Sequence, residues 1–219
     1  MHNVSLVRSV RPEILDVLHQ ESPAALASRN DLHIINNFLG TNKWFRKTLH
    51  EIYRPGDRVL EIGAGIGELS RELSINASVL AGLDLNGRPR QWPRQAVWYK
   101  TNVFDFTRWA DYPVIIGNLV FHHFDHAGLA RLGAWFNEHT RVLITSDPLR
   151  RRRTNLLFAL LCPLIRAHPV TRYDGKMSVA AGFMSEELPN LLHLNRAIWN
   201  WRVVETCFGA YRLVAVKNL

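Results

Sequence analysis

The segment from Val59 to Gly67 reads Val-Leu-Glu-Ile-Gly-Ala-Gly-Ile-Gly and constrains the fold of this chain more than any other. An apolar strand runs into a glycine-rich turn and then into a helical stretch, and glycines let the backbone turn tightly and let a ligand approach it. Read alone, the turn is also compatible with a purely structural junction. The dinucleotide fingerprint has its third glycine one position later, and Glu61 would repel a pyrophosphate while tolerating a cationic amino-acid group. The turn therefore favours S-adenosylmethionine over NAD.

Apolar strands alternate with helical stretches after residue 57, which is typical of a parallel sheet covered on both faces. A few residues around Phe208 and Gly209 join the last two strands, so these should pair as an antiparallel hairpin. The pattern predicts an α/β, Rossmann-like, doubly wound sheet of seven strands, mostly parallel, with N-terminal helices and a helical lid insertion. The expected strands are Arg58–Ile62, Val79–Leu83, Val97–Tyr99, Val114–Leu119, Arg141–Ser146, Trp199–Glu205 and Ala210–Val216, and the expected helices include Gly67–Ile75 and Ala127–Glu138.

A chain of 219 residues is expected to form one domain with additions. In the N-terminal part, Pro23 is expected to break short helices, and apolar residues at three- and four-residue intervals predict one or two helices from Asp31 to Ile52 with a break at Gly40. The predicted single domain (1–219) divides into an N-terminal helical cap (1–55), a cofactor-binding core (56–147), a substrate lid insertion (148–184) and a C-terminal helix with the hairpin (185–219).

The chain is basic, with 27 Lys and Arg against 19 Asp and Glu, a formal net charge of +8 and a sequence pI near 10.0. Between Arg141 and Lys176 there are eight basic residues and two acids, so the positive charge is concentrated there. Such a balance permits a nucleic acid, a membrane surface or an acidic substrate as partner and proves none of them.

Cysteine usage and hydropathy bear on the location of the protein. Cys162 and Cys207 lie far apart and match no metal spacing, so we expect no disulfide, no metal site and a reducing, cytoplasmic compartment. No run of about 18 apolar residues is present for a membrane span, and the first eight residues do not predict a signal peptide.

A second feature supports a nucleoside cofactor. Asp84 ends the second strand about 20 residues past the glycines, where a carboxylate accepts hydrogen bonds from both ribose hydroxyls, although a helix N-cap is the alternative. With these features, residues 57–146 resemble the class I S-adenosylmethionine-dependent methyltransferases, more narrowly the small-molecule group that includes the ubiquinone- and menaquinone-biosynthesis type. The resemblance implies that Glu61 holds the methionine amino end and that Asn102 lies near the adenine, where the family often has aspartate and where Asp105 is the alternative. The implied cofactor-binding residues are Glu61, Gly63, Ala64, Gly65, Gly67, Asp84, Leu85, Asn102, Val103 and Asn118.

Paired histidines, His122 and His123, follow the fourth strand, whose carboxyl end should face the ligands of an open parallel sheet. Paired histidines at this point also resemble the small-molecule members of the family. A histidine suits proton removal near neutral pH, and we rank His123 ahead of His122 as the catalytic base, although either could instead pack locally. Asp147 could orient one of them, or could cap a helix before Pro148.

The long segment after Asp147, residues 148–184, interrupts the alternation of strands and helices, and we call it the excursion. We expect it to select the acceptor. Four arginines, Arg150 to Arg153, precede an apolar stretch from Asn155 to Ile165 that is too short to cross a bilayer. Because it is apolar all round, this stretch is expected to be a lid helix over a hydrophobic acceptor or a helix on a membrane surface (150–165), while the arginine run by itself is more often a solvated face. Beyond it we expect a tight loop forming the rim of a pocket, with the substrate-binding residues His168, Tyr173, Asp174, Met177 and Phe183.

The combined prediction is transfer of a methyl group from S-adenosylmethionine to a hydroxyl or activated carbon of a small, apolar, aromatic or polyketide-like acceptor in the cytoplasm. The alternatives are an RNA methyltransferase, a membrane-surface enzyme acting on a lipid-like quinone precursor, and a cofactor-binding protein without turnover. Against RNA, the chain has Asn118-Leu-Val-Phe where nucleic-acid amino-methylating members carry an Asn/Asp-Pro-Pro-aromatic motif, so a nucleic-acid partner is not expected. The sequence leaves the oligomeric state open.

Overall fold

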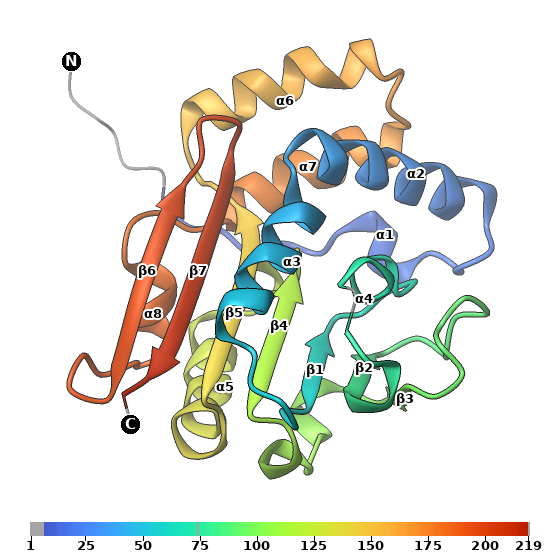
Figure 1. Cartoon of the computed structure of the whole chain (residues 1–219). Helices are drawn as coiled ribbons and strands as arrows, with labels where there is room; N and C mark the ends of the chain where they lie inside the picture. The colour runs from blue at the N-terminus through green and yellow to red at the C-terminus, as the bar shows by residue number, and fades with distance from the viewer. Residues whose placement is uncertain (1–6, 74, 219) are drawn as a thin grey trace.

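The computed structural model describes residues 7–73 and 75–218, and within them seven strands form one sheet in the order β3-β2-β1-β4-β5-β7-β6 (Figure 1). Strands β1 to β5 run parallel, and β7 lies antiparallel between β5 and β6. This confirms the predicted fold class. The strands are β1 (Val59–Ile62), β2 (Leu80–Asp84), β3 (Val97–Lys100), β4 (Val114–Asn118), β5 (Val142–Pro148), β6 (Trp199–Glu205) and β7 (Ala210–Lys217).

The helices agree with the predicted pattern in the core, and the main departure is a helix at 169–181 in place of a predicted loop. The predicted break between helices near Pro23 is present: one helix ends at Val17, and Pro23 begins α2, where its missing N–H costs nothing and Ser22 caps the helix. Helix α2 is longer than expected, because it continues to Phe38. Gly40 does separate two helices, with a φ of +64°. The helices are α1 (Ile14–Val17), α2 (Pro23–Phe38), α3 (Thr41–Ile52), α4 (Glu68–Glu72), α5 (His126–His139), α6 (Arg152–Leu164), α7 (Pro169–Ala181) and α8 (Glu187–Leu191).

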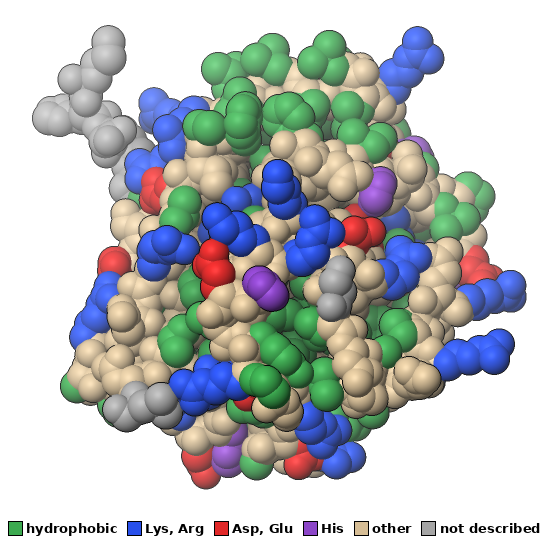
Figure 2. Space-filling model, viewed as in Figure 1, with side chains coloured by type: hydrophobic (Ala, Val, Ile, Leu, Met, Phe, Trp, Pro, Cys, Tyr) green, Lys and Arg blue, Asp and Glu red, His purple; other side chains and the backbone are tan. Residues whose placement is uncertain are grey.

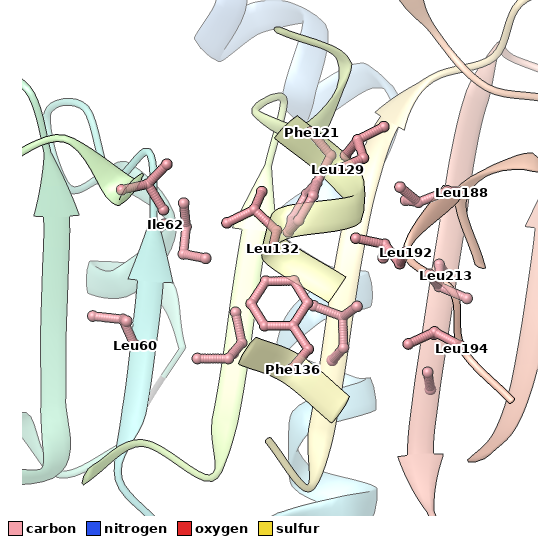
Figure 3. Close-up of a cluster of buried hydrophobic side chains, with 14 of the residues drawn as sticks. Leu60, Ile62, Phe121, Leu129, Leu132, Phe136, Leu188, Leu192, Leu194 and Leu213 are labelled. Carbon is pink, nitrogen blue, oxygen red and sulfur yellow. The ribbon is translucent and has the colours of Figure 1, made fainter. Parts of the chain in front are cut away.

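Two buried clusters fill the two faces of the sheet. On one face, α5 packs Leu129, Leu132 and Phe136 against the strands, together with leucines of the α8 region (Figure 3). On the other face, α3 and α4 contribute Phe45 and Leu69. Apolar side chains on both faces explain why the strands read as nearly continuous hydrophobic runs.

The excursion after β5 is helical rather than looped. Helix α6 occupies the apolar stretch, as predicted for a lid helix, but the expected loop after it is wrong, because Pro169 starts α7 and His168 caps it. A proline directly after a capping residue is a helix-start signal. Predictions that fall on residues 1–6, 74 and 219, including part of the expected helix 67–75, lie outside the described residues.

The topology decides where a ligand site forms. Strand β1 lies between β2 and β4: the chain builds outward from β1 to β2 and β3, then crosses to the other side of β1 to form β4, so the strand order reverses there. In open α/β sheets this switch point opens a crevice beyond the carboxyl ends of the strands. Helices α2, α6 and α7 lie over that edge of the sheet (Figure 1).

Candidate active site

One cavity of about 730 Å³ lies at the carboxyl ends of β1, β2, β4 and β5. Its walls come from four parts of the chain: the turns that follow the strands, the N-terminal segment with α2, the helices α6 and α7, and the β6–β7 hairpin. We refer to the part lined by the turns after β1 and β2 as the cofactor end, and to the part lined by α2, α6, α7 and the β6–β7 hairpin as the acceptor end.

The glycine turn shapes the cofactor end. Gly63 and Gly65 both have positive φ, +65° and +53°, which side-chain-bearing residues rarely adopt. A Cβ on Gly63 would lie 2.5 Å from Val120 Cγ2, whereas one on Gly65 would meet only a backbone oxygen at 4.0 Å. Glycine at 63 therefore permits close packing, and glycine at 65 keeps the cavity open.

Asp84 links the second strand to this turn. Its carboxylate accepts hydrogen bonds from the backbone N–H of Gly65 at 2.8 Å and of Asn86 at 2.8 Å. It lines the cavity and does not cap a helix of the described chain. The carboxylate is thus held in place at the point where β2 ends.

Glu61 is a buried carboxyl beside the same turn. Burial, together with the negative charges of Asp84 and Glu68, raises its pKa to about 8, although hydrogen bonds from Ser70 act in the opposite direction. The Ser70 hydroxyl donates to one Glu61 oxygen. A buried carboxyl next to two further carboxylates is a site at which a cationic ligand group is stabilised.

The other predicted cofactor residues divide between cavity and packing. Asn102 lines the cavity, but its side-chain oxygen accepts from the N–H of Phe104 at 2.9 Å and so caps its own turn. Asp105, the alternative, does not line the cavity, and neither does Gly67, where a Cβ would lie 2.6 Å from Trp92. The predicted residues that do line it are Glu61, Gly63, Ala64, Gly65, Asp84, Leu85, Asn102, Val103 and Asn118.

His122 is fully enclosed between two carboxyl groups. Its Nδ1 lies 2.9 Å from Asp147 Oδ1, its Nε2 lies 3.4 Å from Glu13 Oε1, and Asp147 also accepts from its backbone N–H at 3.1 Å. Burial lowers the pKa of the imidazole, but the hydrogen bonds and charges of Asp147 and Glu13 outweigh it and raise the pKa to about 9. The geometry therefore favours an imidazolium at neutral pH and places Asp147 as its partner rather than as a helix cap.

His123 is the more open of the two imidazoles, with 27% of its side chain exposed. Its Nδ1 lies 3.3 Å from Asp16 Oδ2, and its ring lies 4.2 Å from the ring of His122. His123 lowers the pKa of Asp16, against the effect of burial. A carboxylate at Nδ1 orients an imidazole so that Nε2 is the nitrogen that exchanges a proton.

The same side chains are also spaced for metal binding. Donor atoms of Glu13, His122 and His123 lie within 4.8 Å of one another. This cluster was not expected from the sequence, since it joins the N-terminal segment to the end of β4.

Apolar side chains dominate the acceptor end. Helix α6 presents Phe158 and Leu161 to the cavity, α2 presents Leu32 and Ile35, and the hairpin presents Phe208. Arg29 is a charged exception, whose pKa is lowered by burial in spite of the Asp84 carboxylate. An acceptor bound here would lie against hydrocarbon over most of its surface.

The five predicted substrate-binding residues do not line the cavity, because the segment is a helix and only one of its faces, at Gly175, Ser178 and Val179, points inward. Asp174 instead accepts from the backbone N–H groups of Ile14 and Leu15. His168 caps α7, Phe183 is buried in the core, Tyr173 is half-exposed, and Met177 is outside the lining.

Glu13, Asp16, Arg29 and Asn36 line the cavity and were missed. No local signal distinguishes them, since they lie in a polar N-terminal stretch about 100 residues from the histidines. Arg8 holds this stretch in place by donating to the backbone oxygens of His122, Phe124 and Ala181. Only the folded chain shows that the N-terminal segment lies against the end of β4.

No protein-family model and no curated protein matches the chain. Solved structures do share its fold. The plantazolicin methyltransferase BpumL, in complex with a triazolic desmethylPZN analog and SAH, is 12% identical, with a TM-score of 0.68 over 90% of this chain and 90% of that chain. The pyocyanin biosynthetic protein PhzM is 16% identical, with a TM-score of 0.57 over 91% of this chain and 60% of that chain. The methyltransferase domain of bacterial CtHen1-C is 15% identical, with a TM-score of 0.52 over 81% and 97%.

These similarities confirm the predicted fold, which the chain shares with solved methyltransferases such as BpumL. Among the described residues, no helix is both long enough and apolar enough to cross a membrane.

Proposed function

We propose that this protein transfers a methyl group from S-adenosylmethionine to a hydroxyl or activated carbon of a small, apolar acceptor of aromatic or polyketide-like type. The observation that carries the proposal is a single cavity lined by buried carboxyls and a glycine turn at the cofactor end, by hydrocarbon at the acceptor end, and by two histidines. The SAH-bound state of BpumL, which has the same fold, supports the choice of cofactor.

The residues present at the cofactor end fit such a group. Glu61 is a buried carboxyl whose pKa is raised by burial and by the Asp84 and Glu68 charges, and an ammonium group beside it would stabilise its ionised form. Asp84 is held at the end of β2, in the position from which it would accept from ribose hydroxyls. Asn102 and Val103 would border the adenine.

The bound cofactor supplies a methyl group on a positively charged sulfur. Because a cationic donor and an electron-rich acceptor cancel their charge as the methyl moves, a dry apolar site favours the transition state. Leu161, Phe158 and Ile35 would exclude water and align the acceptor, which is the main contribution of the protein to such a displacement.

His123 would remove the proton of the acceptor hydroxyl through Nε2, with Asp16 orienting the ring at Nδ1. His122 has a different role, because Asp147 and Glu13 hold it as a cation. It would act as a positioning residue that, through Asp147 and Glu13, fixes the turn that carries His123.

The test is binding followed by turnover. Calorimetry should show S-adenosylmethionine and its demethylated thioether binding to the intact chain, and mass spectrometry should then show a gain of one methyl group on alkylated phenols. Absence of heat with both compounds would refute the proposal. Methylation of RNA without methylation of the phenols would show that the acceptor is RNA and not a small apolar molecule.

A further inference from the structure

Helix α6 has a second apolar face that nothing in the described chain covers. Leu156, Leu160 and Leu164 recur every four residues and are 62%, 59% and 80% exposed, so they form one line along the helix. The opposite face is already packed, since Cys162 is buried and Phe158 contacts Gly175 of α7. The exposed line is therefore additional to what the fold of the protein requires.

This exposed line continues into the rim of the cavity. Leu160 and Leu164 line the cavity as well as facing outward, and so do Phe38 at the end of α2 and Phe208 at the tip of the β6–β7 hairpin. The rings of Phe38 and Phe208 pack edge to face at 5.2 Å. Figure 2 shows hydrophobic side chains gathered over α6, with Lys and Arg side chains at the edges of the cluster. The apolar patch and the mouth of the cavity are thus one surface.

Positive charge surrounds the patch without any acidic residue in the same segment. Between Asp147 and Asp174 the sequence has six arginines and no Asp or Glu. Arg150 pairs with Glu187 and Arg151 pairs with Glu205. The remaining arginines of the segment, Arg152, Arg153, Arg166 and Arg172, are exposed.

We propose that this α6 face, defined by Leu156, Leu160, Leu164, Phe38 and Phe208 with Arg152, Arg153 and Arg166, docks on the surface of a bilayer that contains anionic phospholipids. Exposed leucine and phenylalanine side chains bordered by arginines match the acyl region and the phosphate level of such a surface. A second copy of the chain fits less well, because it would bring arginines of like charge together.

Docking would place the mouth of the cavity against the lipid. An apolar acceptor dissolved in the bilayer would then reach the acceptor end between α6 and the hairpin without crossing water. This consequence for the acceptor rests on the proposed function, whereas docking does not, so vesicle binding and methyl transfer can fail independently.

The test is sedimentation of the intact protein with vesicles of phosphatidylcholine alone and of phosphatidylcholine with phosphatidylglycerol. We expect binding to the anionic vesicles to be at least tenfold stronger and to weaken with salt. A fluorophore attached to the exposed Cys207, next to Phe208, should shift to the blue when these vesicles are added. Equal binding to both vesicle types, or to neither, would overturn the proposal.

Variants test whether vesicle binding depends on the α6 face or only on the net charge of the protein. The double substitution Arg152→Gln with Arg153→Gln should lower binding to anionic vesicles about tenfold, and Leu156→Asp should lower it further; none of these residues lines the cavity. The matched control, Arg90→Gln with Arg94→Gln, removes the same charge from the β2–β3 connection and should bind as the unaltered chain does. If both double variants lost the same amount of vesicle binding, net charge alone would explain the binding, and the proposal would be contradicted. A dimer in solution that Leu156→Asp dissociates would also contradict it, because a second copy would then cover the face.

Discussion

The two ends of the cavity are built in different ways. The cofactor end comes from residues 61–118, in which each turn follows its own strand, and its distinctive groups are carboxyls such as Glu61 and Asp84. The acceptor end comes from residues 13–39, 154–179 and 208–210, which are far apart in sequence, and its distinctive groups are leucine and phenylalanine side chains. Local chain geometry makes the first end, and tertiary packing makes the second.

This difference has a chemical consequence. Carboxyls fixed by backbone N–H groups at a turn recognise a polar ligand of defined shape, so the same arrangement serves many proteins of this fold. A wall of helices that pack on one another changes shape with each side chain, which suits it to selecting an acceptor. The histidines and their carboxylates lie where the two ends meet. Substitutions at the two ends should therefore separate into effects on cofactor binding and effects on turnover or acceptor binding.

The largest expected effect is at the junction. His123→Ala should lower turnover at least about a hundredfold, the usual contribution of a general base, while the dissociation constant of S-adenosylmethionine stays within about twofold of the original. Steady-state kinetics and calorimetry measure the two quantities. His126→Ala, an exposed histidine at the start of α5, is the matched control and should leave both unchanged. Normal turnover of His123→Ala would show that another group removes the proton.

A second prediction concerns the buried carboxyl of the cofactor end. The folded chain keeps the Glu61 proton up to a pKa of about 8, whereas the ordinary pKa of a glutamate carboxyl is 4.5, so folding takes up a proton between these values. The free energy of unfolding should therefore fall as pH rises from 4.5 to 8. Glu61→Gln should remove about 2 kcal/mol of this fall between pH 5 and 7, as measured by urea denaturation at each pH. An unchanged pH dependence would show that Glu61 is already ionised in the folded chain.

Asp84→Ala should act on the cofactor end alone. Loss of the carboxylate removes the proposed ribose contacts, and we expect cofactor affinity to fall about twentyfold, the value of one or two charge-assisted hydrogen bonds. Turnover at saturating cofactor should change far less. Asp105→Ala, which lies outside the cavity lining, is the control for calorimetry and should bind as before. Equal losses in the two variants would remove Asp84 from the proposed site.

Leu161→Ala should act on the acceptor end alone. Removing this side chain from the cavity wall takes away apolar contact with the acceptor, and we expect KM for an alkylated phenol to rise about tenfold, from the free energy of burying a leucine side chain. Cofactor affinity should be unchanged by calorimetry. A variant that loses cofactor affinity instead would show that the two ends are not separable.

The sheet and the cofactor end were predictable because their signals are local. Alternating apolar runs identify all seven strands to within about two residues at their ends, and the glycines at 63 and 65 occupy backbone conformations that favour glycine. Helix α7 is not predicted from the sequence, because its first turn reads as a polar loop and Pro169 is compatible with a loop as well as with a helix start. An error of this kind misplaces every side chain, since only each third or fourth residue of a helix faces the cavity.

The sequence alone determined the mixed α/β sheet, the glycine turn and the two carboxyl groups beside it, Glu61 in β1 and Asp84 at the end of β2, since each depends on residues adjacent in the chain. Tertiary structure alone decided which groups surround the histidines, because Glu13 and Asp16 reach them from more than 100 residues away. It also decided that His122 is buried between two carboxyl groups that raise its pKa, while His123 is partly exposed. The physical reason is that burial and the approach of opposite charges are properties of packing, which neighbouring residues in the sequence do not specify.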